Sequence, residues 1–161
     1  MSLNILIIEG NNSDDSSVFV KAAGATAADN LKNLVLKLEP SSNIKIINPT
    51  NDNETEDALK SINQYNGIIF TGGAMRINDM TDEIKKHINF ASNCFKHDKK
   101  ILAICWGLQV CSTAAGGSVE PAKNGVHDAK GHHHILVDVD VPGDLSKPIG
   151  KDANHIHMGD G

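Results

Sequence analysis

The sequence predicts an α/β protein built as a three-layer, doubly wound and mostly parallel sheet. The first observation is a series of short apolar runs, typical of strands that are covered on both faces. The second is that helical segments separate these runs, an alternation that indicates a parallel sheet. The third is that several runs end in glycine or cysteine, at the edge where ligands bind in such sheets.

Four apolar runs form the predicted strands. They cover Leu3–Ile8, Asn43–Asn48, Gly67–Thr71 and Lys100–Cys105. The run Ile135–Val141 alternates apolar and polar residues, which predicts one more strand. We expect one domain over residues 1–161, because 161 residues with 40% hydrophobic content are enough for a single core.

Four helices are predicted between and after these strands. They cover about Ala25 to Glu39, Glu54 to Ile62, Thr81 to His97 and Trp106 to Ala115. The first has an apolar stripe at i, i+3, i+4 and i+7, formed by Leu31, Leu34, Val35 and Leu38. Thr81 is a predicted N-cap. The polar segment Glu9–Asp15 predicts a loop.

The bulk composition excludes several classes of protein. A net charge of −5, with scattered Lys and Arg, gives no reason to expect a nucleic-acid partner. No apolar run approaches the roughly 20 residues that cross a bilayer, so we expect no membrane partner. Three cysteines without a framework spacing, and no signal peptide, predict reduced thiols and a cytoplasmic location.

Cys105 stands where the fourth strand turns into a helix. Such a turn pushes the side chain out of the sheet, and the helix N-terminus behind it stabilises a thiolate. Cys105 is therefore a candidate nucleophile, and the alternative is a small apolar residue that ends a buried strand. Cys94 and Cys111 fall within helices and are predicted to be structural thiols.

Gly72 and Gly73 follow the third strand, at the same edge of the sheet as Cys105. Two glycines permit a conformation in which a backbone amide faces an anionic oxygen. Most Gly-Gly pairs are simple turns, so this pair indicates a functional site only because it shares an edge of the sheet with Cys105. Arg76, a few residues later, could meet a carboxylate or simply be solvated. Glu9, after the first strand, could line the site or only begin a loop.

Three stretches together resemble the class I glutamine amidotransferase family, and especially its stand-alone members related to the amidotransferase domain of GMP synthase. These are ILAICWGLQV around Cys105, GIIFTGG and NILIIEGN. The resemblance covers Asn4 to about Val119 and resumes near His155. It implies the family's flavodoxin-like fold, glutamine as substrate and a possible synthetase partner that receives ammonia. It implies no cofactor.

The resemblance also implies roles for particular residues. Cys105 attacks the side-chain amide of glutamine, and the amides of Gly73 and Trp106 hold the oxyanion. Gln109 and Gly72 help to bind the substrate.

The family's histidine lies near the carboxyl end, in the stretch NHIHMGDG. His157 is the expected base and His155 the alternative. Gly159 stands where the family usually has the orienting acid, so Asp160 is a weak candidate for that acid. Because relatives continue with a further strand and helix, we expect the domain to be incomplete at its C-terminal end.

Four other histidines suggest a metal site at first sight, namely His127 and the run His132–His134. Adjacent histidines on a strand point to alternate faces, and two ligands without a third make a poor zinc site. We therefore expect solvated histidines and no metal.

The sequence as a whole favours a domain that hydrolyses glutamine. One alternative is another cysteine hydrolase, such as a γ-glutamyl peptidase. Another is a non-catalytic binding or regulatory domain that has lost the catalytic acid.

Overall fold

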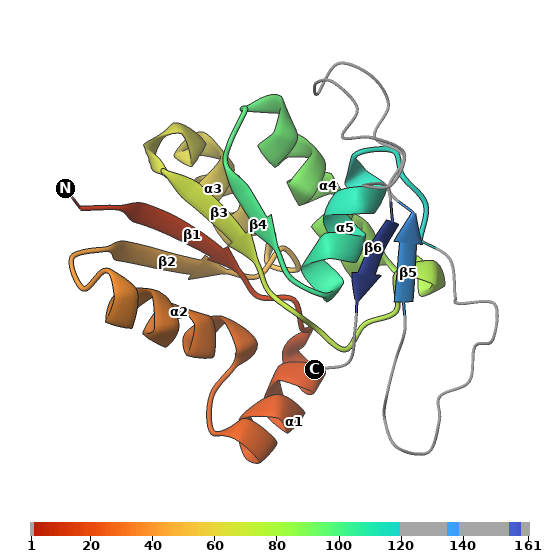
Figure 1. Cartoon of the computed structure of the whole chain (residues 1–161), viewed down its shortest axis with the longest axis horizontal. Coiled ribbons are helices and arrows are strands. Elements are labelled where there is room, and N and C mark those ends of the chain that lie inside the picture. The colour runs from red at the N-terminus through yellow and green to blue at the C-terminus, as the bar shows by residue number, and fades with distance from the viewer. Residues whose placement is uncertain (1, 120–134, 139–154, 159–161) are drawn as a thin grey trace.

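The computed structural model describes residues 2–119, 135–138 and 155–158. Its main sheet has four parallel strands in the order β2-β1-β3-β4 (Figure 1). The strands are β1 (Asn4–Ile8), β2 (Asn43–Ile47), β3 (Gly67–Phe70) and β4 (Ile101–Ala103). The predicted parallel α/β sheet is confirmed, although β4 ends two residues earlier than expected.

The carboxyl ends of the strands are level with one another. Ile8 pairs with both Ile47 and Phe70, and Phe70 pairs with Ala103. From β1 the chain passes outward to β2 and then returns across β1 to β3. The strand order therefore reverses between β1 and β3, which is where ligand sites form in open α/β sheets. The segments that follow these two strands meet at that point.

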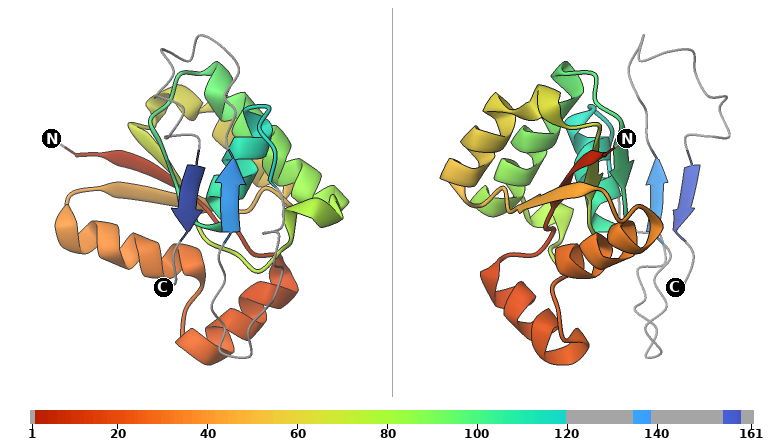
Figure 2. Two further views of the ribbon diagram at one scale, coloured as in Figure 1. Left: turned by 45° about the vertical axis from the view of Figure 1, so that its right-hand side comes forward. Right: turned by 90° about the vertical axis from the view of Figure 1, so that its left-hand side faces the viewer.

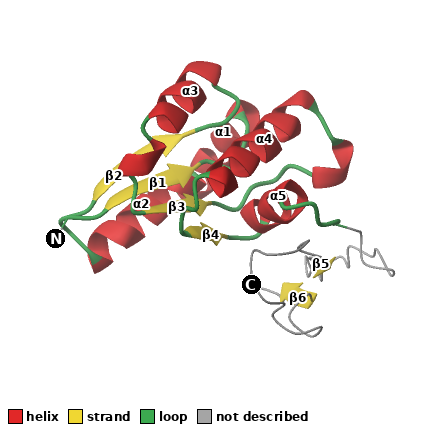
Figure 3. Ribbon diagram, turned by 90° about the horizontal axis from the view of Figure 1, so that it is seen from above, coloured by secondary structure: helices red, strands yellow, loops and turns green. Residues whose placement is uncertain are grey.

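Helices cover both faces of the sheet, as the three-layer prediction requires. The helices within residues 2–119 are α1 (Ser13–Ala23), α2 (Ala27–Leu38), α3 (Asp52–Lys60), α4 (Asp82–Lys96) and α5 (Trp106–Ala114), together with two short 3-10 turns, η1 (Ile62–Gln64) and η2 (Ile77–Asp79). Figures 2 and 3 show α3 and α4 on one side of the sheet and α2 on the other. The core lies on the first side, where Leu6 and Phe70 pack with Phe90 of α4 and Val110 of α5.

Each of α1 to α4 begins at a side chain that caps it. The capping residues are Asn12, Thr26, Asn51 and Thr81. Each accepts a hydrogen bond from a backbone amide of the first turn, which satisfies a donor that has no partner within the helix. The predicted N-cap at Thr81 is therefore confirmed.

Two expectations for the first half of the chain were wrong in part. Residues 13–15, predicted as loop, open helix α1, whose asparagine cap and acidic first turn favour a helix although it buries no residue. The stripe on α2 is also less buried than its period suggests. Leu34 and Leu38 are exposed, and Ala28 is the buried residue of that helix. Both differences arise because α1 and much of α2 extend beyond the core.

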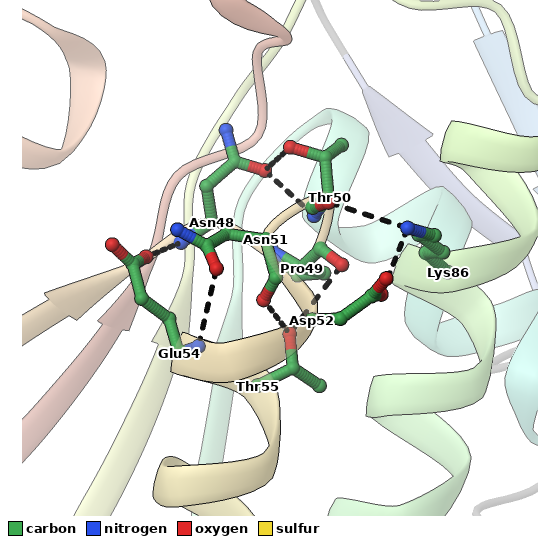
Figure 4. Close-up of polar contacts among 8 residues, drawn as sticks. All are labelled: Asn48, Pro49, Thr50, Asn51, Asp52, Glu54, Thr55 and Lys86. Atoms are coloured by element: carbon green, nitrogen blue, oxygen red, sulfur yellow. Dashed lines mark hydrogen bonds and ion pairs between the residues drawn. The ribbon is translucent and has the colours of Figure 1, made fainter.

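The turn after β2 links α3 to α4 (Figure 4). Lys86 of α4 lies 2.8 Å from a carboxylate oxygen of Asp52 and donates to the carbonyl of Thr50 at 3.3 Å. In the same turn the side-chain oxygen of Asn48 accepts from both the amide and the hydroxyl of Thr50. These bonds hold the amide group of Asn48 in one orientation.

The remaining described segments pair as a two-stranded antiparallel sheet. Strand β5 (Ile135–Asp138) pairs with β6 (His155–Met158), and Leu136 lies opposite His157. The first four residues of the predicted strand Ile135–Val141 are thus confirmed, and the rest lie outside the described residues. Among the helices that the structure describes, none has the length and apolar character to span a bilayer.

Candidate functional site

The backbone turns sharply at Cys105, between β4 and α5. Cys105 has φ 50° and ψ −107°, a conformation that L-residues rarely adopt and that costs of order 1–3 kcal/mol. Hydrogen bonds on both sides hold this turn against the end of β3: Ile104 donates to the carbonyl of Phe70 at 3.0 Å, and Gly107 donates to that of Thr71 at 3.1 Å. The side chain of Cys105 is exposed as a result. This is the geometry predicted for a nucleophile at a strand-to-helix turn.

Gly107 lets α5 approach the sheet closely. A Cβ at this position would lie 2.5 Å from Cβ and 2.7 Å from the carbonyl oxygen of Phe70. Real Cβ atoms do not come this close to backbone, so a larger residue would push the helix away. The glycine after Cys105-Trp106 is therefore a packing requirement of the turn.

The segment Gly72–Ala74 lies beside Cys105, and we call it the oxyanion loop after the role that the sequence predicts for Gly73. A Cβ placed at Gly72 would be 3.7 Å from Cβ of Cys105. A Cβ at Gly73 would collide with the carbonyl of Gly10, and one at Gly10 would lie 2.5 Å from the carbonyl oxygen of Gly72. The segment after β1 and the oxyanion loop are therefore packed backbone against backbone. The sequence identified Gly72 and Gly73 but missed the part played by Gly10.

Two backbone amides that the sequence predicts as oxyanion donors have no hydrogen-bond acceptor within the described part of the chain. Among the described residues, neither the amide of Gly73 nor that of Trp106 donates a hydrogen bond to another group. Trp106 is the first residue of α5, whose N-terminus adds a favourable field for negative charge. These are the two donors that the sequence predicted for an oxyanion.

Gln109, a predicted substrate-binding residue, lies one turn into α5. Only 8% of its surface is exposed, and its backbone amide donates to the carbonyl of Cys105 at 3.2 Å. Its position under the turn leaves little of the side chain open to a ligand. Its role in binding substrate stays a prediction.

A surface pocket of about 290 Å³ adjoins the oxyanion loop. Arg76 contributes a guanidinium to its lining, and Asp15, Asp79 and Glu83 contribute carboxylates. The pocket therefore presents both signs of charge close to Ala74, which also lines it.

The predicted base and acid lie at the far end of the chain. His157 and its alternative His155 are both in β6, of which the structure describes the backbone. Asp160 lies outside the described residues, as do His127 and His132–His134. Both histidine assignments and the weak assignment of Asp160 stay predictions.

The structure places another imidazole behind the turn. His87 of α4 is 1% exposed, and its ring stands edge-on to that of Trp106 with centroids 5.9 Å apart. Burial lowers the pKa of His87 from 6.5 to about 4, so the ring is neutral at pH 7. Its apolar contact with Trp106 helps to position the residue that follows Cys105.

The other two thiols are buried, as predicted. Burial raises the pKa of both Cys94 and Cys111 from 9.0 to about 12, so both stay protonated at neutral pH.

In the part of the chain that the structure describes, no group of three His, Cys, Asp or Glu side chains is arranged to hold a metal ion.

The sheet, the turn at Cys105 and the oxyanion loop agree with a family match. Residues 20–152, most of the chain, match the family described as glutamine amidotransferase class-I. The chain therefore belongs to the class-I glutamine amidotransferase family, and the predicted family is confirmed.

Two curated proteins give a finer comparison. The chain is 27% identical over 121 residues to a γ-glutamyl-L-1-hydroxyisopropylamide hydrolase of Pseudomonas sp, and the aligned region covers 75% of this chain and 40% of that protein. It is 34% identical over 93 residues to γ-glutamyl peptidase 2 of Arabidopsis thaliana, covering 56% of this chain and 36% of that protein. The chain thus spans well under half the length of these relatives. None of the solved structures matches it significantly.

Proposed function

We propose that this chain hydrolyses γ-glutamyl amide bonds, with Cys105 as the nucleophile. The observation that carries the proposal is the strained, exposed cysteine at the start of α5, beside the glycines of the oxyanion loop. The names of both relatives specify a γ-glutamyl group. Glutamine is the γ-glutamyl amide of ammonia, so the glutaminase and γ-glutamyl peptidase hypotheses concern the same kind of bond.

The reaction proceeds through a thioester. The sulfur of Cys105 attacks the γ-carbonyl carbon, and the amides of Gly73 and Trp106 stabilise the oxyanion that forms. The C–N bond then breaks, and the departing amine takes the proton that the base, His157, removed from the thiol. Water attacks the thioester next and releases the γ-carboxylate and the free thiol.

The pocket beside Ala74 supports a γ-glutamyl substrate. Such a substrate carries an α-amino group and an α-carboxylate several bonds away from the reacting carbonyl. Arg76 offers a partner for the carboxylate, and the acidic residues of the pocket offer a partner for the ammonium group. Gln109 and Gly72 complete the proposed binding residues nearer to Cys105.

Transfer of ammonia from glutamine to a synthetase partner is the second candidate function. The family match favours it, because the family takes its name from that transfer. The names of the two relatives favour hydrolysis, in which water is the final acceptor.

A panel of substrates and one labelling reaction test the proposal. The purified chain is incubated with glutamine, a γ-glutamyl dipeptide, a γ-glutamyl anilide and the matching α-glutamyl anilide, and released glutamate or aniline is measured. We expect turnover of γ-glutamyl compounds alone, and none with Cys105→Ser. Preference for the dipeptide or the anilide over glutamine supports the peptidase hypothesis, whereas glutamine as the best substrate supports the glutaminase.

The labelling reaction uses diazo-oxo-norleucine, an electrophilic glutamine analogue, followed by mass spectrometry. An adduct on Cys105, with Cys94 and Cys111 unmodified, supports the nucleophile assignment. A folded chain that forms no adduct and releases no product would overturn the proposal and favour a non-catalytic domain.

A further inference from the structure

A buried carboxylate is connected to the oxyanion loop through one residue, Asn11. Glu9 follows β1, and its surface is 5% exposed. One carboxylate oxygen accepts from the amide and the side-chain nitrogen of Asn11, at 3.1 and 3.0 Å. The other accepts from the backbone amide of Ala28, in the first turn of α2, at 2.8 Å. An unpaired buried carboxylate would be strongly unfavourable, so these three bonds account for its position.

Asn11 relays the position of Glu9 to the oxyanion loop. Asn11 is 2% exposed, and its side-chain oxygen accepts from the amide of Ala74 at 2.8 Å. Only the NH2 group of an asparagine can donate to a carboxylate, and only its oxygen can accept from an N–H. Glu9 therefore determines which way the side-chain amide points, and that orientation presents the oxygen to Ala74.

Asn11 is also anchored through its backbone. Its carbonyl accepts from the side-chain nitrogen of Asn48 at 2.7 Å. The oxygen of the same Asn48 side chain is held by Thr50, as Figure 4 shows. The residue that contacts the oxyanion loop is thus fixed from β1, β2 and α2 together.

The contact with Ala74 constrains a segment that would otherwise have many conformations. Two glycines in succession give the oxyanion loop more freedom than any other pair of residues. A hydrogen bond to the amide of Ala74 fixes the planar peptide group that joins it to Gly73. The same contact spans the point where the strand order reverses, between the segments after β1 and β3. The contact thereby fixes the carbonyl and the α-carbon of Gly73, the residue whose own amide is the proposed oxyanion donor.

We propose that Glu9 and Asn11 are positioning residues that hold the oxyanion loop in the conformation required for reaction at Cys105. This inference rests on the proposed function. Neither residue touches the reacting atoms, so each acts through the amide of Ala74. The sequence could not assign this role to Glu9, because its partners lie at positions 11 and 28 and act on position 74.

Two reagents separate positioning from general damage to the fold. Reaction of Cys105 with diazo-oxo-norleucine depends on a correctly placed γ-carbonyl, whereas alkylation by iodoacetamide depends mainly on access to the thiol. The ratio of the two rates is measured for the unaltered chain, Asn11→Ala and Glu9→Gln. Gln keeps the size of Glu9 but presents an NH2 group in place of one accepting oxygen, so it disturbs the bonds with little change in packing.

We expect Asn11→Ala to lower the rate ratio about 10- to 100-fold and Glu9→Gln to lower it less, because loss of a whole oxyanion donor costs about 100- to 1000-fold. Asn66→Ala is the matched control. Asn66 also accepts from a backbone amide across the sheet, that of Asn4 at 2.8 Å, but it does so at the opposite edge. Its loss should leave the ratio within about twofold. An unchanged ratio in both folded test variants would overturn the inference.

Amide hydrogen exchange tests the positioning independently of activity. Exchange at Ala74 should be faster in Asn11→Ala and unchanged in Asn66→Ala. If iodoacetamide alkylates the unaltered chain but the glutamine analogue does not, the proposed function is wrong. Hydrogen exchange at Ala74 then still tests whether Asn11 positions the oxyanion loop. Equal protection of Ala74 in the unaltered chain and in Asn11→Ala would contradict it.

Discussion

The strain at Cys105 leads to a prediction that separates stability from function. Replacing Cys105 with glycine removes the thiol and also removes the Cβ that makes φ 50° unfavourable. Replacing it with alanine removes the thiol but keeps the Cβ. Because the Cys105 side chain is exposed, neither change gives up much buried surface. The difference between the two variants therefore reports the backbone strain, reduced by the flexibility that glycine adds to the unfolded chain.

The magnitude follows from two opposing effects. A non-glycine residue in this conformation costs about 1–3 kcal/mol, which glycine recovers. Glycine also makes the unfolded chain more flexible, which costs about 0.4–1 kcal/mol relative to alanine. We expect Cys105→Gly to be more stable than Cys105→Ala by about 0.5–2 kcal/mol. In a domain of roughly this size that is a difference in Tm of about 1–8 °C.

Thermal unfolding followed by circular dichroism measures this difference, and urea denaturation gives the free energy. Both variants should fail to react with diazo-oxo-norleucine. If the glycine variant is no more stable than the alanine variant, the backbone at Cys105 is not strained.

Three further predictions concern the surroundings of the turn. Gly73→Ala should lower stability by about 1–3 kcal/mol and slow labelling of Cys105, because its Cβ would lie against the backbone of Gly10. Gly72→Ala places its Cβ at an ordinary contact distance and should change stability by less than about 1 kcal/mol. Equal melting temperatures of the two variants would contradict this. As the pH falls from 6.5 to 4, the free energy of unfolding should decrease by about 3 kcal/mol because of His87, since its imidazole binds a proton in the unfolded state but stays neutral in the folded state. His87→Gln should remove this part of the pH dependence, as measured by urea denaturation at each pH. The same pH dependence in both proteins would refute the prediction. At pH 8, iodoacetamide should leave Cys94 and Cys111 of the folded chain unmodified, and it should alkylate both in denaturant. Mass spectrometry measures the labelling, and comparable labelling without denaturant would mean that the two thiols are not buried.

The local pattern was sufficient to predict most of the fold. In a strand such as β1, which forms from the run Leu3–Ile8, side chains on both faces are buried, so the strand is a continuous apolar run. Such a run can be identified in the sequence without knowing which strands lie beside it. The cap at Thr81, which begins α4, is likewise a local feature. Helix α1 was missed because it buries nothing, so its apolar residues show no period that a core would impose.

The candidate site was predicted only in part, for a related reason. A cysteine or a glycine pair at the end of a strand can be identified from the sequence, because parallel strands bring their carboxyl ends to one edge. Gly10 also follows a strand at this edge, but its contact with the carbonyl of Gly72 cannot be inferred from the sequence. The contact of His87 with Trp106 cannot be inferred from it either, because it depends on how α4 packs beside α5.

The sequence by itself determined the order of strands and helices, the class of fold and the position of Cys105 at the edge where such folds bind ligands. These features depend on residues close together in the chain, whose period and turn chemistry are visible locally. Only the tertiary structure decided that Cys105 is strained and that Asn11 supports Ala74, 63 positions away. A hydrogen bond between distant segments exists only once the sheet has brought β1 and β3 side by side.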